Sequence, residues 1–420
     1  MKADTADISR LEQHIAPPSL QTVRLVYLFL LANHRSNGGM NKDRLLTIVK
    51  ILSVAACLYL FLVGIGGMGY SFKLFGKEFS QKILEATSSP LIGLFIGILA
   101  TTIVQSSSTT TSIIIGMVAA EAIGVRSAIF MVMGANIGTT VTAKLVSLGH
   151  ITRKAEFRRA FAASSVHDTF NLTTVALLYP LEYFFGIIET SATWMGGIFV
   201  NVTGITKPEN YLKKITKPAV EGLSELLNNI PWLVLLVSVI ITFFMLWGIV
   251  KLLQSLVLKK LESFFDTYVF RNLAMSFIVG MVLTVMVQSS SITTSLIVPL
   301  AGAGVLRLQQ IFPFTIGANI GTTITGLLAA LAVAGQPGID PKLVLAGATV
   351  AFAHFLFNAS GAVIFLPFKK IRDIPVRAAE WLAEACLKNR IIPIVFIVLV
   401  FYLIPLVLTW SSIAKVFSEN

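Results

Sequence analysis

Long stretches without a single charged residue limit what this chain can fold into. Eight of them recur along the 420 residues, and a helix needs only about 20 apolar residues to span a bilayer. They run over Ile51–Phe72, Ala86–Ala120, Ser127–Ala143, Pro231–Val250, Asn272–Leu306, Leu308–Ile339, Leu343–Phe368 and Ile391–Ala414. Only 13% of the residues are charged, whereas soluble domains carry roughly 25%. We therefore predict an all-α polytopic membrane protein.

The formal net charge of +12 does not indicate a nucleic-acid-binding protein. The Lys and Arg residues lie in short connectors between apolar stretches, as membrane topology requires, and are not gathered on one face. The two cysteines, Cys57 and Cys386, are too few for a disulfide framework or a metal site. We expect no transition metal and no cofactor.

The chain contains an internal repeat. Val104–Ser112 reads VQSSSTTTS and Val287–Ser295 reads VQSSSITTS, while Gly134–Thr142 reads GANIGTTVT and Gly317–Thr325 reads GANIGTTIT. Both pairs are separated by 183 positions. A third match, of His167–Asn171 with His354–Asn358, follows at an offset of 187. A self-similar pattern at a fixed period indicates a duplicated unit.

The charges after each GANIGTT motif predict opposite orientations for the two repeats. The connector after the first motif carries Lys144, Arg153, Lys154, Arg158 and Arg159. The equivalent stretch of the second repeat, Gly326–Lys342, holds Lys342 beside Asp340 and no other charge. Because cytoplasmic loops are enriched in Lys and Arg, these connectors should lie on opposite sides, which makes the repeats inverted.

These patterns divide the chain into six segments. We expect a cytoplasmic N-terminal extension over 1–44, with Met40 as an alternative start, and then a first transmembrane helix and connector over 45–85. Repeat 1 follows over 86–185. The segment over 186–271 holds an external loop, a linking transmembrane helix and a cytoplasmic connector, repeat 2 covers 272–370, and an amphipathic segment with the last transmembrane helix covers 371–420.

Each QSSS motif lies near the middle of a 35-residue uncharged segment, too long for one span and barely long enough for two. We predict a re-entrant hairpin or a broken helix there, which transporters use for a site near the bilayer midplane. Hydroxyl, amide and backbone N–H groups at such a break favour a small oxyanion. The anion-binding residues expected are Gln105, Ser106, Ser107, Ser108, Gln288, Ser289, Ser290 and Ser291. The alternative is that these small residues only promote close helix packing.

The GANIGTT motifs supply the oxygen ligands that hard cations prefer, from Asn136, Thr139, Asn319 and Thr322. Their glycines would let the backbone unwind and expose carbonyls for Na⁺. No Lys or Arg lies within either QSSS segment, which favours coupling of the anion to a cation. A small-residue packing face would also explain the glycines.

Asp168 is the one acidic residue between Arg159 and Glu182, and an intramembrane carboxylate is by default a functional candidate. Its counterpart in the second repeat is Phe355, so its charge is not duplicated. The alternative is a structural carboxylate held by His167 or Asn171. We expect His167 and His354 to hydrogen-bond within the core.

At these motifs the chain resembles the type II sodium-phosphate cotransporter family, over roughly residues 45–370. The resemblance rests on both QSSS motifs, both GANIGT segments, Phe157–Phe161 and the His167–Asn171 run. It implies inorganic phosphate bound between the QSSS segments, and sodium sites to which Asn171, Asn358, Thr322 and Thr325 belong. It also implies that Asp168 holds an additional sodium ion and makes transport electrogenic. The chain departs from some members at Ala318, His150 and Arg153.

The sequence therefore predicts a sodium-coupled phosphate symporter of the cell membrane that works by alternating access and is not an enzyme. One alternative is a transporter of another oxyanion, such as sulfate or a small carboxylate, and another is a passive anion channel. An intramembrane hydrolase using Ser with His167 or His354 is disfavoured, because the serines are duplicated and no glycine-framed serine elbow is present.

Overall fold

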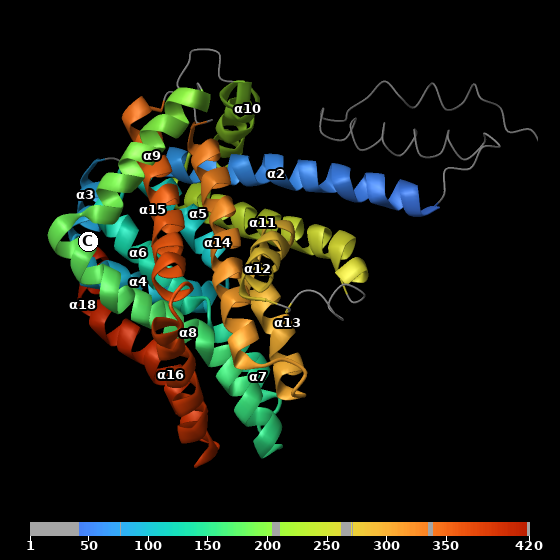
Figure 1. Cartoon of the computed structure of the whole chain (residues 1–420). Coiled ribbons are helices and arrows are strands. Elements are labelled where there is room, and N and C mark those ends of the chain that lie inside the picture. The colour runs from blue at the N-terminus through green and yellow to red at the C-terminus, as the bar shows by residue number, and fades with distance from the viewer. Residues whose placement is uncertain are drawn as a thin grey trace, which may run out of the picture. The chain divides into compact units, whose positions relative to one another are not determined.

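The computed structural model describes residues 42–75, 77–203, 211–261, 270, 272–334 and 339–417, whose regular secondary structure is entirely helical (Figure 1). Contacts divide the chain into residues 1–52 and residues 53–420. Of the N-terminal extension expected over 1–44, residues 42–44 are described, and the rest, which includes Met40, lies outside the described residues. Six of the described helices are long and apolar enough to cross a membrane, or up to seven if a bent pair counts as one span. The prediction of an all-α polytopic membrane protein is confirmed.

The helices follow one another with short connections. Those up to the end of the first repeat are α2 (Lys42–Phe75), α3 (Lys77–Ala86), α4 (Pro90–Val104), α5 (Ser107–Ala119), α6 (Val125–Gly138), α7 (Val141–Leu148) and α8 (Lys154–Phe185). Those that follow are α9 (Ile187–Thr203), α10 (Tyr211–Leu226), α11 (Pro231–Leu261), α12 (Leu273–Val287), α13 (Ser290–Gly302), α14 (Leu308–Ala334), α15 (Pro341–Phe365), α16 (Lys369–Leu387), α17 (Ile392–Val398), the π-helix η2 (Leu399–Leu403) and α18 (Ile404–Phe417). The segment over 186–271, which was expected to begin with an external loop, thus begins with two helices, α9 and α10, ahead of the linking helix α11.

The two GANIGTT motifs lie on the most deeply buried spans. In the most apolar window of the α6–α7 span, Val125–Leu148, 83% of the residues are buried, and in α14 the value is 72%. The span at the start of α11, Pro231–Ile249, reaches only 28%. The inner spans therefore take their surroundings from protein, while the outer ones present apolar side chains that suit lipid.

Each QSSS motif breaks a helix, as predicted. The first break separates α4 from α5 at Gln105 and Ser106, and the second separates α12 from α13 at Gln288 and Ser289. The motifs therefore place two pairs of helix ends inside the protein. Whether the two repeats are inverted stays a prediction.

The GANIGTT glycines allow close helix packing; the expectation that they unwind the backbone is wrong for the second motif, whereas in the first motif the helix is interrupted directly after Gly138. Helix α6 continues through Gly134 and ends at Gly138, with Thr139 and Thr140 between it and α7, whereas α14 continues through both Gly317 and Gly321. A Cβ atom on Gly134 would overlap the carbonyl oxygen of Leu94 in α4, and one on Gly317 would overlap that of Phe277 in α12. Because only a residue without a side chain fits there, the glycines bring each motif against the broken helix of its own repeat.

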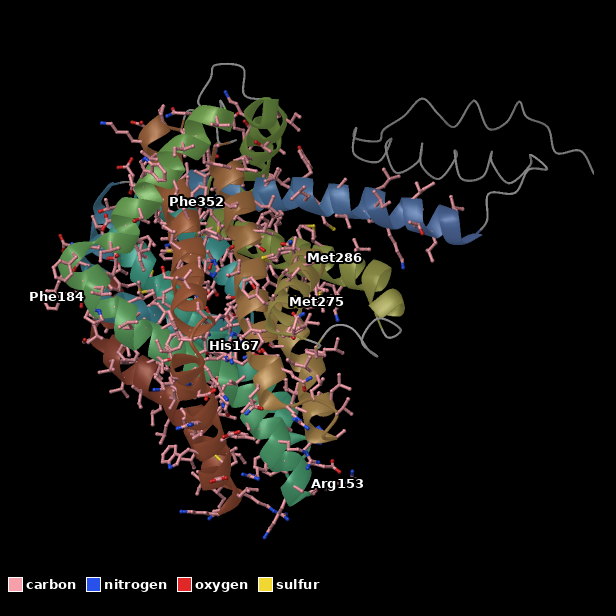
Figure 2. All side chains as sticks on the ribbon, viewed as in Figure 1. Arg153, His167, Phe184, Met275, Met286 and Phe352 are labelled. Carbon is pink, nitrogen blue, oxygen red and sulfur yellow. The ribbon has the colours of Figure 1, made fainter. Side chains whose placement is uncertain are left out.

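Lys144 does not lie in a solvated connector, which corrects its assignment from the charge pattern. It belongs to α7, and none of its side chain is exposed. The connector itself begins after α7 and ends at Arg153, which caps the start of α8. Further along α8, His167 lies among the other helices (Figure 2). A lysine can be buried in this way only if a partner compensates its charge.

Candidate functional site

The two helix breaks have the same backbone geometry. Gln105 has φ 58° and Gln288 has φ 56°, both in the left-handed region that non-glycine residues seldom adopt. The next residue caps the following helix in each case: Ser106 Oγ accepts a hydrogen bond from Thr109 N at 3.2 Å, and Ser289 Oγ accepts one from Ile292 N at 3.3 Å. The identical sequence thus folds into the same strained corner twice.

Each glutamine holds its corner in place through both ends of its amide. Gln105 Nε2 donates to Thr102 O at 2.5 Å, and its Oε1 accepts from Thr142 Oγ1 at 2.7 Å. The second repeat has the same pair of bonds, from Gln288 Nε2 to Val285 O at 2.6 Å and from Thr325 Oγ1 to Gln288 Oε1 at 2.8 Å. The glutamine therefore joins the broken helix to the GANIGTT segment of its own repeat.

The two breaks meet at one cavity of about 250 Å³. Its lining comes from both motifs, from α7 and from α11: Val104, Gln105, Ser106, Thr109, Thr142, Phe243, Leu246, Trp247, Gln288, Ser289, Ser291 and Ile292. None of these residues carries a charge. The N-termini of α5 and α13 begin at this cavity, where unpaired N–H groups and the helix dipole favour an anion.

Five of the eight predicted anion-binding residues line this cavity, and Ser107, Ser108 and Ser290 do not. These three are nearly buried in the first turns of α5 and α13. The sequence reasoning missed Thr142, although its repeat counterpart Thr325 had been selected. It also missed the wall formed by α11, whose aromatic residues are not distinguishable within an uncharged apolar stretch.

A buried hydrogen-bond network joins four asparagines from both repeats. Asn171 Nδ2 donates to Asn136 O at 2.6 Å, Asn319 Nδ2 donates to Asn171 Oδ1 at 2.9 Å, and Asn358 Nδ2 donates to Asn136 Oδ1 at 3.1 Å. His167 Nε2 lies 2.6 Å from Asn319 Oδ1. At most 5% of any of these side chains is exposed. Helices α6, α8, α14 and α15 thus meet through uncharged polar groups.

This network is composed of the oxygen ligands that a hard cation prefers. Asn358 Oδ1 is buried and has no hydrogen-bond partner among the described residues, so one acceptor of the network is unused. The network also lies near the cavity, because Ser291 Oγ donates to Thr139 O at 3.4 Å and Thr139 belongs to the same motif as Asn136. Among the described residues, then, Asn136, Asn171, Asn319 and Asn358 form a candidate sodium site.

The threonines predicted to bind sodium have other partners. Thr139 Oγ1, at the C-terminal end of α6, donates to Ala135 O at 2.8 Å, and Thr322 Oγ1 donates to Ala318 O at 3.0 Å within α14. Thr325 donates to the Gln288 amide, as described above. A hydroxyl that donates to a carbonyl still has lone pairs for a cation, so the sodium roles of these three residues stay predictions.

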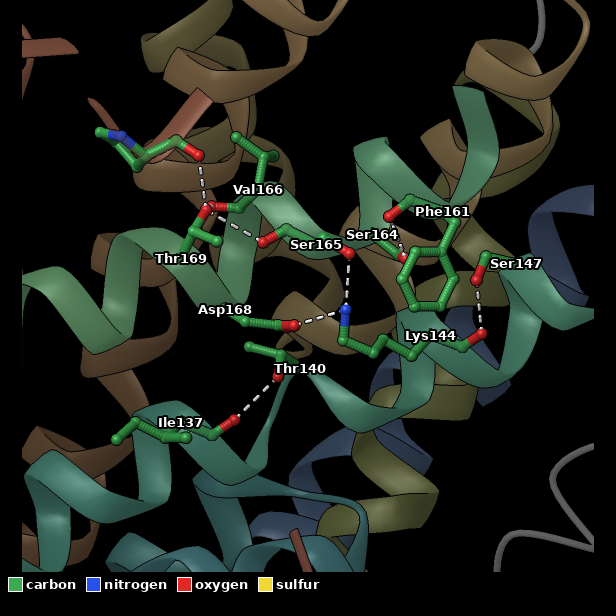
Figure 3. Close-up of polar contacts among 11 residues, drawn as sticks. Ile137, Thr140, Lys144, Ser147, Phe161, Ser164, Ser165, Val166, Asp168 and Thr169 are labelled. Carbon is green, nitrogen blue, oxygen red and sulfur yellow. Dashed lines mark hydrogen bonds and ion pairs between the residues drawn. The ribbon is translucent and has the colours of Figure 1, made fainter. Parts of the chain in front are cut away.

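Asp168 is paired with Lys144, one of the five cations that the sequence analysis had placed in the connector after the first GANIGTT motif. Lys144 Nζ lies 2.5 Å from Asp168 Oδ2 and donates to Ser165 Oγ at 2.6 Å (Figure 3). Both charged side chains are fully buried. The partner is neither His167 nor Asn171, which belong to the asparagine network. The sodium-binding role expected of Asp168 stays a prediction, with Lys144 as a competing occupant.

Comparison with known proteins connects this geometry to a family. The model of the Na⁺/Pi-cotransporter family matches residues 60–197 and 243–370, which include both breaks and both GANIGTT segments. Sodium-dependent phosphate transport protein 2A of Ovis aries is 31% identical over 88% of this chain and 68% of its own length. Sodium-dependent phosphate transport protein 2B of Pongo abelii is 29% identical over 87% of this chain and 66% of its own length. The chain spans about two thirds of these relatives, and no solved structure matches it.

Proposed function

Because the chain belongs to the Na⁺/Pi-cotransporter family, we propose that it carries inorganic phosphate across the cell membrane in symport with sodium. The matched regions support this proposal, since they contain every residue assigned above to the phosphate and sodium sites. The relatives are named as sodium-dependent phosphate transport proteins. The matched part of this chain contains the uncharged cavity, which suits an anion, and the asparagine network, which suits a hard cation.

The single observation that carries the proposal is the uncharged cavity between the two QSSS breaks. Two helix N-termini begin there, and Ser106, Ser289 and Ser291 bring hydroxyls to it. Phosphate has several acceptor oxygens, which such donors satisfy from two sides. A shared cavity also gives a reason for the duplication, because neither repeat alone supplies the complete lining.

Sodium coupling follows from charge balance. The cavity lining contains no Lys or Arg, so the charge of phosphate is compensated only in part by helix dipoles. Bound cations supply the remainder, and the asparagine network offers oxygen ligands near the cavity through the contact of Ser291 with Thr139. We propose that sodium binds at this network together with phosphate, and that the two cross by alternating access.

Three other functions make different predictions. A transporter of sulfate or a carboxylate would use the same neutral cavity, and competition with labelled phosphate separates these substrates. A passive channel would pass phosphate without sodium. A serine hydrolase would need a serine activated by a histidine, whereas His167 is hydrogen-bonded to Asn319.

The test is uptake of labelled phosphate into proteoliposomes, with sodium or choline outside at equal osmolarity. We expect uptake in sodium only, inhibition by excess unlabelled phosphate and little inhibition by sulfate. Ser106→Ala and Ser289→Ala should each weaken phosphate binding, since each removes a hydroxyl from the cavity. Ser88→Ala is the matched control, because Ser88 is exposed and its hydroxyl donates to the nearby Glu85 O. Equal uptake in sodium and choline would contradict the proposed function.

A further inference from the structure

The surroundings of Lys144 form a complete site for a cation. Its ammonium contacts the Asp168 carboxylate at 2.5 Å and Ser165 Oγ at 2.6 Å. The centres of the Phe161 and Phe396 rings lie 4.4 Å and 5.2 Å from Nζ, within the range in which a cation is attracted to an aromatic face. Helices α7, α8 and α17 thus enclose a positive charge with one anion, one hydroxyl and two rings.

The occupant of this site is attached to the protein. A buried carboxylate must be compensated by a cation or become neutral. An oxygen site with a carboxylate and a hydroxyl would suit a sodium ion, but here the ammonium of Lys144 occupies the position beside Asp168. Neither Lys144 nor Asp168 is exposed at all, so the pair is closed off from the medium.

The pair adds no net charge to the protein. Asp168 has no acidic counterpart in the second repeat, where Phe355 takes its place. The charge that distinguishes the two repeats is therefore cancelled within the first repeat itself. For sodium that enters with phosphate, the described residues still offer the uncharged oxygens of the asparagine network, namely Asn136, Asn171, Asn319 and Asn358.

We propose that Lys144 serves as a tethered counter-cation that replaces a sodium ion at Asp168, so that the transport cycle moves no sodium ion at this position. This inference rests on the proposed function. It makes Lys144 a residue that sets the number of sodium ions and the number of charges moved with each phosphate. Removal of the ammonium should open Asp168 to sodium and add one sodium ion, and one charge, to the cycle.

The experiment compares wild type with Lys144→Met and with the double variant Lys144→Met, Asp168→Asn. Methionine keeps an apolar stem without the charge, and the double variant removes both charges of the pair. Phosphate accumulation in proteoliposomes is measured at steady state, with equal sodium on both sides and a potential of about 100 mV, negative inside. One additional charge per phosphate raises the accumulation ratio about fifty-fold at this potential. Because this ratio reports stoichiometry, a slow variant is as informative as a fast one.

We expect the accumulation ratio of Lys144→Met to exceed that of wild type about fifty-fold, and the double variant to match wild type. If Lys144→Met does not fold, the double variant, which has no unpaired charge, still tests whether wild type binds a sodium ion at Asp168, and Lys144→Gln then replaces Lys144→Met as the variant in which the ratio should rise. A double variant whose ratio is about fifty-fold below that of wild type would overturn the proposal, since Asp168 would then bind sodium despite Lys144. Equal ratios for wild type and a folded Lys144→Met would also overturn it.

A binding measurement separates failure of this inference from failure of the proposed function. In the absence of phosphate, sodium should raise the melting temperature of Lys144→Met more than that of wild type, with potassium as the reference salt. If no protein takes up phosphate but this difference is present, the tethered cation stands and the proposed substrate is wrong. If uptake is sodium-dependent but the variants do not differ in stoichiometry or in sodium-induced stabilisation, only the tethered cation is wrong.

Discussion

The hydrogen bond between each corner glutamine and its threonine should control phosphate affinity. Replacing Thr142 by valine keeps the side-chain shape and removes the donor to Gln105 Oε1, a contact of 2.7 Å. An acceptor that loses its partner costs about 1–3 kcal/mol when it is buried. Gln105 and Thr142 are partly exposed, so water limits the loss, whereas Thr325 is fully buried beside Gln288. We expect phosphate affinity to fall about fivefold in Thr142→Val, for about 1 kcal/mol, and about thirtyfold in Thr325→Val, for about 2 kcal/mol.

Double-mutant cycles test the reasoning. Labelled phosphate binding is measured at saturating sodium for Thr142→Val, Gln105→Met and the combination, and for the equivalent variants of Thr325 and Gln288. Once the glutamine is gone, the threonine change should have little further effect. Additive losses within a pair would refute the coupling. An effect of Thr325→Val that persists beside Gln288→Met would assign that hydroxyl to sodium instead. The control is Thr193→Val, at an exposed threonine that bonds only within α9.

Three other predictions concern stability and reactivity. Lys144→Met and Asp168→Asn should each destabilise the protein by about 3–5 kcal/mol, because each leaves an unpaired buried charge, and their combination should destabilise it by much less. Melting curves in detergent measure this, and losses of stability that add up in the double variant would contradict it. Gly134→Ala should destabilise the protein by about 1–3 kcal/mol, because the new Cβ atom would overlap the Leu94 carbonyl. Gly197→Ala should be neutral or stabilising in the same assay, because a Cβ atom at Gly197 has no neighbouring atom within 4 Å. Burial raises the pKa of the Cys386 thiol to about 11. In a Cys57→Ser background, its reaction with maleimide should therefore be slow at pH 8 and accelerate about tenfold per pH unit up to pH 10. A rate that does not change with pH would contradict this.

The duplicated motifs made most of the site predictable. An uncharged segment of 35 residues with polar residues at its centre required a break, and the fixed offset required two equivalent breaks. Asn136 and Asn319 could be selected from the duplicated GANIGTT motif, whereas Asn171 and Asn358 were selected through the resemblance to the cotransporter family. The structure brings all four together in one hydrogen-bond network.

What the sequence could not predict depends on contacts between segments that are far apart in the chain. Lys144 and Asp168 are separated by 24 positions, and no local pattern distinguishes a buried lysine from one in a cytoplasmic connector. The glycines of GANIGTT were compatible with unwinding and with close packing alike, and only the carbonyls of α4 and α12 decide between them. The α11 wall of the cavity lies outside both repeats, so the duplication gave no information about Phe243, Leu246 or Trp247.

The buried Lys144–Asp168 pair has a consequence for the energy economy of the cell. Every sodium ion that enters with phosphate must later be expelled, so a cation that stays in the protein lowers the cost of each phosphate taken up. The same pair lowers the highest concentration ratio that uptake can sustain, by about 500-fold for a tenfold sodium gradient and a potential of 100 mV. Such a carrier suits surroundings in which phosphate is plentiful and energy is scarce, and a single substitution at Lys144 would shift it toward scavenging.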